Sequence, residues 1–206
     1  MEIKLNNTFY AGNQMWSSNK AIHDYGCGIV AAFDSFNYLY NKKAGSNIYS
    51  DLSSKTYIKT VESFAKKYFS YPFGINGLAL ASGMNKIFRN YELPYSAKWV
   101  SSKDKLFERI KGMLSNDIPV IFSIGPNFPL FWKKHELIFY QKNDNDNLVP
   151  IERVTDHYAT IIAIDDNWLT VSSWGLEYLI RISEYKYYVE NYSNYLFSNV
   201  ILITLV

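Results

Sequence analysis

The chain has 206 residues, of which 48% are hydrophobic, enough for one ordinary domain with a sizeable core. Its net charge of +2 comes without a clustered basic face, so a nucleic-acid partner is not expected. No apolar run reaches the ~20 residues of a membrane span. Residues 1–14 have no long apolar core behind a basic head. These features predict neither a membrane partner nor a secretory signal, and they make the cytoplasm the default location.

The first half of the chain is predicted to be mainly helical. Residues 1–14 form an extended segment, and the loop over 41–54 is polar. The strongest helix covers residues 27–40, because its apolar side chains fall at helical offsets, namely Ile29, Ala32, Phe33, Phe36 and Tyr40. Similar spacing predicts further helices over 56–69, 75–90 and 103–115. Ser102 is a plausible N-cap for the last of these.

After Pro119 the pattern changes to strands. Short apolar runs bounded by turn residues predict strands over 120–124, 137–142, 157–164, 168–173, 176–182 and 195–205. A polar turn covers 143–147, a tight turn at 165–167 makes a hairpin of its two flanking strands, and a short helix covers about 183–190. The element order predicts an α+β fold. We expect one domain over 1–206, with a helical part to about 118 and a sheet part from about 119.

Cys27 is the first candidate for chemistry. A single cysteine excludes an intramolecular disulfide and a Cys-rich metal site, and the three histidines lack ligand spacing. Gly26-Cys27-Gly28 stands where a loop becomes a helix, so the thiol faces unpaired backbone N–H groups and the positive end of the helix dipole. We therefore expect a lowered thiol pKa and a nucleophilic role. The alternative is an inert thiol that merely begins a buried helix.

His157 is the second candidate, at the head of an apolar strand. It is either a satisfied core residue or a general base presented at a sheet edge. A base needs a partner for its second ring nitrogen. The predicted hairpin supplies one, because a residue some fifteen positions later lies on the neighbouring strand. Ser172 occupies that position.

Two short blocks, near 10–40 and 155–176, resemble the papain-like cysteine peptidase superfamily. Asp156-His157 and Ser173-Trp174-Gly175 are similar to the papain branch. Gln14, Trp16 and Gly26-Cys27-Gly28 are similar to the bacterial branch that includes bacteriocin-leader-processing peptidases. The resemblance implies a Cys helix packed against a C-terminal antiparallel sheet that carries the histidine.

The resemblance also implies roles for single residues. Gln14 would donate its side-chain amide to the oxyanion hole together with the Cys27 N–H, and Asn13 and Asn19 are rival donors. Trp174 would shield the hydrogen bond between the histidine and its partner. His23 could line the cleft, and the aromatic segment 128–132 is a packed loop or a partner site.

Ser172 departs from the family pattern. The papain branch has Asn before Ser-Trp-Gly and the bacterial branch often has Asp, whereas a serine hydroxyl accepts the imidazole N–H without charge. Asp156, Asp165 or Asp166 could compensate if one lies close. Asp156 is expected to point the other way along the strand, and the other two stand in a turn.

Three functions follow as hypotheses. The first is a cysteine peptidase with a Cys27–His157 dyad or triad that transfers an acyl group from a peptide, without metal or organic cofactor. The second uses the same site as an amidase or acyltransferase on a non-protein amide or thioester. The third is a catalytically inactive relative that binds peptides, which Ser172 favours.

Overall fold

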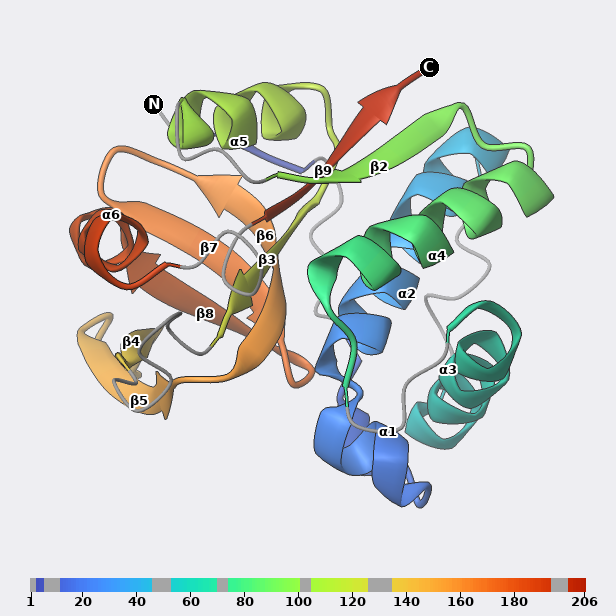
Figure 1. Ribbon diagram of the computed structural model, residues 1–206. Helices are drawn as coiled ribbons and strands as arrows, with labels where there is room; N and C mark the ends of the chain where they lie inside the picture. The colour runs from blue at the N-terminus through green and yellow to red at the C-terminus, as the bar shows by residue number, and fades with distance from the viewer. Residues whose placement is uncertain are drawn as a thin grey trace.

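The computed structural model describes residues 3–5, 12–45, 53–69, 74–100, 105–125, 135–193 and 200–206. Within these ranges the chain forms six α-helices, one 3-10 turn and nine strands that belong to one sheet. Figure 1 shows helices α2, α3 and α4 gathered on one side of the molecule and most strands on the other. The predicted α+β class is confirmed.

Each predicted helix has a counterpart in the structure, whereas the short helices Gln14–Trp16 and Lys20–Tyr25 were not predicted, and Gln14 is no part of an extended segment. The helices are η1 (Gln14–Trp16), α1 (Lys20–Tyr25), α2 (Cys27–Ala44), α3 (Ser54–Tyr68), α4 (Gly77–Asn90), α5 (Leu106–Ser115) and α6 (Ile182–Asn191). Helix α2 continues four residues past its predicted end, into the predicted loop, and ends where Gly45 adopts a positive φ of 63°. Ser102 lies outside the described residues, and Lys105 is the N-cap of α5.

The strands are β1 (Ile3–Lys4), β2 (Tyr95–Trp99), β3 (Val120–Ile124), β4 (Leu137–Lys142), β5 (Leu148–Val154), β6 (His157–Ile164), β7 (Trp168–Ser173), β8 (Leu176–Arg181) and β9 (Val200–Leu205). Strands β2 and β5 were not predicted. Both stand at the ends of the strand order, and β5 contains Pro150 and four consecutive exposed residues. Such an edge strand lacks the apolar run that marks a buried one.

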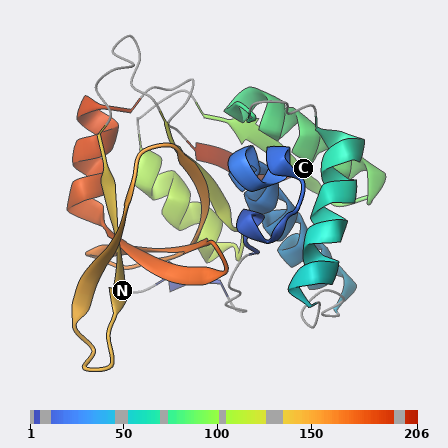
Figure 2. The same ribbon diagram turned by 90° about the horizontal axis from the view of Figure 1, so that it is seen from below.

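All pairings in the sheet are antiparallel, in the order β2-β9-β3-β6-β7-β8-β4-β5, with β1 added to the end of β6. The predicted hairpin of β6 and β7 is confirmed. Seen from below in Figure 2, the strands bend round one side of the molecule while the helical bundle occupies the other. Strand β6 lies in the middle of the order, and its first residue, His157, pairs with Ile124 of β3.

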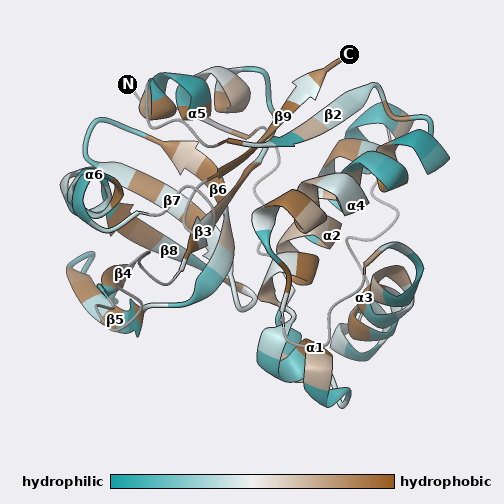
Figure 3. Ribbon diagram, viewed as in Figure 1, coloured by the Kyte–Doolittle hydropathy of each residue, from teal (hydrophilic) through white to brown (hydrophobic). Residues whose placement is uncertain are grey.

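Helix α2 is buried almost all round. Its buried residues include the off-stripe side chains of Val30, Ala31 and Leu39, because it contacts β6 and β3 of the sheet as well as α3 and α4. Figure 3 shows hydrophobic colour along the central strands, with more mixed colouring on the outer helices α3 and α5. Buried side chains of the helical part and of the sheet belong to one hydrophobic core. The N-terminus of α2 is thereby fixed against the sheet.

A membrane span is not found in the part of the chain that the structure describes. No helix there combines the length and apolar character that crossing a bilayer requires.

Candidate active site

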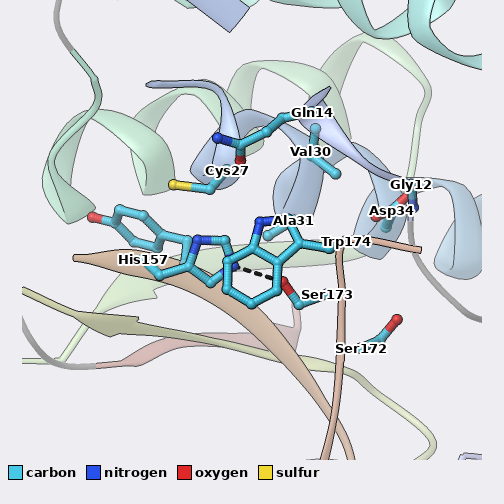
Figure 4. Close-up of a pocket in the computed structure, with 11 residues that line it drawn as sticks. Gly12, Gln14, Cys27, Val30, Ala31, Asp34, His157, Ser172, Ser173 and Trp174 are labelled. Carbon is cyan, nitrogen blue, oxygen red and sulfur yellow. Dashed lines mark hydrogen bonds between the residues drawn. The ribbon is translucent and has the colours of Figure 1, made fainter. Parts of the chain in front are cut away.

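One small pocket brings the predicted site residues together. It lies between η1, the start of α2, the start of β6 and the end of β7, and Gln14, Cys27, His157 and Ser172 all line it. Figure 4 shows Gln14 and Cys27 on one wall, with His157 and Trp174 facing them. The pocket is narrow and has room for about one water molecule.

The chain around Cys27 keeps the first turn of α2 open towards this pocket. Gly26 ends α1 and begins α2, and its position has no side-chain cap for the N–H groups of the first turn. Gly28 allows the helix to lie close to the sheet, because a Cβ there would stand 2.9 Å from Ile75 and 3.1 Å from Tyr158. Gly28 therefore brings the thiol next to strand β6.

The predicted lowering of the Cys27 pKa is not what this environment produces. Burial raises the pKa of the thiol, with a small further rise from Asp156. Backbone groups of Tyr158, Gly28 and Cys27 itself act in the opposite direction and do not offset the burial. Cys27 retains partial contact with solvent, which limits the effect of burial. The prediction was wrong because it considered the helix terminus without the sheet packed against it.

His157 is buried more completely, with 6% of its surface exposed. Its Nε2 is 2.6 Å from the Ser173 hydroxyl, and the Trp174 indole stacks on the ring at 4.1 Å between centroids. Burial lowers the pKa of His157 to about 3, so the ring is neutral at physiological pH. Within the described residues no hydrogen bond joins the Cys27 sulfur to this ring, and the sulfur meets the Tyr158 backbone instead.

Ser173, not the predicted Ser172, is the partner of His157. Ser172 pairs with Thr160 in the register of β6 and β7. Side chains alternate between the two faces of a strand, and Thr160 is three positions from His157, so the two point to opposite faces. Ser172 shares the face of its partner Thr160, whereas Ser173 shares the face of His157. Figure 4 shows the Ser172 hydroxyl directed away from the ring. The predicted partner and the observed partner of His157 therefore differ by one position along β7.

A turn in an unusual conformation places Trp174. Ser173 pairs with Leu176, which leaves a two-residue loop between β7 and β8. Both loop residues have positive φ, 48° at Trp174 and 76° at Gly175. This conformation is common for glycine but costs energy for a bulky aromatic residue. The loop holds the indole over His157 in the shielding position that the resemblance implies.

Gln14 is better placed than its rivals to donate to the pocket. Its amide Nε2 donates to the His23 carbonyl at 3.0 Å, which leaves a second N–H of the same nitrogen. Asn13 caps η1 and donates to the Trp174 carbonyl, and Asn19 caps α1. Neither of these two asparagines lines the pocket.

Asp165 and His23 have partners outside the pocket. The Asp165 carboxylate accepts the backbone N–H groups of Asn167 and Trp168, so it belongs to the turn. The side chain of His23 contacts Asp24. The aromatic segment 128–132 lies outside the described residues.

Sequence reasoning missed Asp34, a buried carboxyl group that lines this pocket. It stands seven residues after Cys27, which is two turns along the same face of α2. Asp34 lies off the apolar stripe, but its neighbours there, Val30 and Ala31, are apolar as well. A carboxylate in a helix that is apolar on all sides is the signal that could have revealed it, since such groups are buried only with partners.

Comparisons with known proteins leave the family open. No protein-family model matches the chain, and no curated protein matches it. Among the described residues, no three His, Cys, Asp or Glu side chains gather closely enough to hold a metal ion.

Proposed function

We propose that this chain is a papain-like cysteine hydrolase, of the kind most similar to the bacteriocin-leader-processing branch, and that it acts by acyl transfer on a peptide. One observation carries the proposal: a thiol at an uncapped helix start, a histidine bonded to a hydroxyl and covered by an indole, and a side-chain amide all line one pocket. The Cys helix packs on an antiparallel sheet whose central strand begins with the histidine.

The chemistry starts from a neutral pair, because burial raises the Cys27 pKa and lowers the His157 pKa. Rotation about χ1 moves the sulfur from the Tyr158 backbone towards the imidazole. Nδ1 of His157 then takes the thiol proton as the sulfur bonds to the substrate carbonyl carbon. Ser173 accepts the Nε2–H and keeps Nδ1 free to act as the base.

The tetrahedral intermediate places negative charge on the former carbonyl oxygen. The free N–H of Gln14 and the Cys27 backbone N–H are the donors for that oxygen. The carbon then loses its leaving group, which takes the proton from His157, and an acyl-thioester remains on Cys27. Water attacks the thioester with His157 as base, and a carboxylic acid and the free thiol result. A non-protein amide or thioester would follow the same steps.

A catalytically inactive, peptide-binding relative is the second candidate. The neutral imidazole and the absence of a hydrogen bond between sulfur and ring in the described contacts favour it. The partner hydroxyl also carries no charge to stabilise an imidazolium.

4-Nitrophenyl acetate separates the two, because it is an activated ester with a small acyl group. Acetylation of Cys27 is followed by intact mass and by release of 4-nitrophenolate, in wild type and in single variants. If His157 is the general base, His157→Ala should lower the rate of Cys27 acetylation by about 100-fold or more. Ser173→Ala should lower the acetylation rate by about tenfold, because the imidazole ring loses its orienting partner. Ser172→Ala, the matched neighbour, should keep the wild-type acetylation rate within about twofold.

Two outcomes would contradict the proposed hydrolase. Equal acetylation in wild type and His157→Ala would mean that the histidine is no base. No acetylation of Cys27 between pH 5 and 9 would support the peptide-binding relative.

A further inference from the structure

Asp34 is a buried carboxyl group in the same pocket as Cys27. It lies on the same face of α2, about 10 Å further along the helix axis, and is only 2% exposed. The titratable groups that face this pocket are Cys27 from the same helix and His157 and Tyr158 from β6, and Tyr57 of α3 contacts the carboxyl directly. No lysine or arginine is among the described residues that line it.

Both oxygens of Asp34 are engaged by donors from other parts of the chain. The Tyr57 hydroxyl donates to Oδ1, and the Gly12 backbone N–H donates to Oδ2 at 3.1 Å. Burial without a facing cation raises the pKa of Asp34 to about 7, while its two donors act against that rise. The Asp34 carboxyl, on α2, therefore joins this helix by hydrogen bonds to α3 and to the chain segment that precedes α1.

That segment, residues 12–16, carries Gln14. Its other contacts reach different elements: Asn13 donates to the Trp174 carbonyl, and Gln14 donates to the His23 carbonyl. Trp16 packs edge-on against the Tyr57 ring at 5.9 Å. Asp34 ties this segment to the helix of Cys27 itself.

Gly12 is required for that contact. A Cβ at this position would stand 2.0 Å from the Tyr57 ring, so any larger residue would displace either the segment or the tyrosine. The close approach lets the Gly12 N–H and the Tyr57 hydroxyl reach the same carboxyl group.

We propose that Asp34 is a positioning residue, which holds residues 12–16 against α2 and so sets the place of the Gln14 amide in the oxyanion site. The inference rests on the proposed acyl transfer, since the oxyanion exists only in that reaction. Asp34 touches neither substrate nor reacting atoms; it acts through Gly12 and Gln14.

Two probes of Cys27 isolate this role. 4-Nitrophenyl acetate reacts through a tetrahedral oxyanion, whereas iodoacetamide is displaced at a saturated carbon and needs no oxyanion donor. Tyr57→Phe removes one donor to Asp34 without creating a cavity. Tyr38→Phe is the matched control, because Tyr38 has the same 8% exposure and its hydroxyl donates to a different carboxyl, that of Asp117.

The expected result is selective. Tyr57→Phe should slow acetylation of Cys27 by about fivefold to tenfold and leave alkylation within about twofold, because only the oxyanion donor moves. Tyr38→Phe should leave both rates within about twofold. Asp34→Asn, whose amide can still accept from Gly12 and donate to the tyrosine oxygen, should retain most of the acetylation rate.

A double variant tests whether the effect passes through Gln14. Gln14→Ala alone should slow acetylation, and Tyr57→Phe added to it should cause no further loss, because residues that act as a unit are not additive. Losses that multiply, or equal losses in acetylation and alkylation, would overturn the positioning role. If the wild type does not acetylate Cys27 at all, the proposed function fails instead, and the two failures are therefore distinct.

Discussion

The pH dependence of folding stability gives a direct test of the environment of Asp34. Asp34→Asn changes the charge and little else, because the amide oxygen can accept the Gly12 N–H and the amide nitrogen can donate to the Tyr57 oxygen. The variant is a permanent copy of the protonated side chain. Any pH-dependent difference in stability between it and the wild type belongs to the titration of Asp34.

The magnitude follows from the pKa of Asp34. Burial raises it from 3.8 to about 7, an interval of about three pH units. Each unit corresponds to about 1.4 kcal/mol, so the interval corresponds to about 4 kcal/mol. A raised pKa means that the folded chain binds the proton more tightly than the unfolded chain. This contribution to stability is therefore full below about pH 4 and is lost as the pH rises to about 7.

Urea or thermal unfolding of both proteins between pH 4 and pH 8 measures this difference. Relative to Asp34→Asn, the wild type should lose about 4 kcal/mol across the interval, or about 10 °C in Tm for a chain of this size. The comparison with the variant is necessary because protonation of His157 changes the stability of both proteins in the opposite direction.

Gly112→Ala provides the control, because it adds no titratable group and its difference from wild type should be constant with pH. A wild-type minus Asp34→Asn difference that is equally flat would refute the reasoning. It would mean that Asp34 is ionised across this range in the folded chain, stabilised by a partner that offsets its burial.

Three further predictions concern packing and the histidine. Burial lowers the pKa of His157 from 6.5 to about 3, so the folded chain should lose about 5 kcal/mol as the pH falls through this range, and acid unfolding of His157→Gln should lack that loss. Trp174→Ala uncovers the ring and should raise the His157 pKa, measured by NMR titration of its Cε1 proton. Gly112→Ala meets open space in a helix and should stabilise the chain by about 0.5–1 kcal/mol, whereas Gly12→Ala collides with Tyr57 and should destabilise it by about 1–3 kcal/mol, both by chemical unfolding.

Much of the fold could be predicted from local pattern. Helix α2 and strands β3, β6 and β7 were predicted because their apolar residues repeat with the period of the element or fill it completely. The edge strand β5 was missed, because exposed polar residues and a proline carry no such signal. Strands of that kind are defined by hydrogen bonds to a neighbour, and the neighbour is not visible in the local sequence.

The candidate site was also predicted only in part. Sequence selected Cys27, His157 and Gln14, and all three line one pocket. The sequence indicated Ser172 as the partner of His157, but in the observed register Ser173 is the partner. Counting positions along a hairpin does not determine which face of the sheet a residue occupies.

The sequence by itself determined the α+β class, the helix that begins at Cys27 and the strand that begins at His157, since spacing and turn residues act locally. Only the tertiary structure decided the charge states of the site. Burial depends on what packs against a residue, and here it raises the pKa of Cys27, lowers that of His157 and raises that of Asp34. It also decided that Asp34 faces Gly12, because no local pattern connects two residues whose contact exists only after the helices and the sheet have packed together.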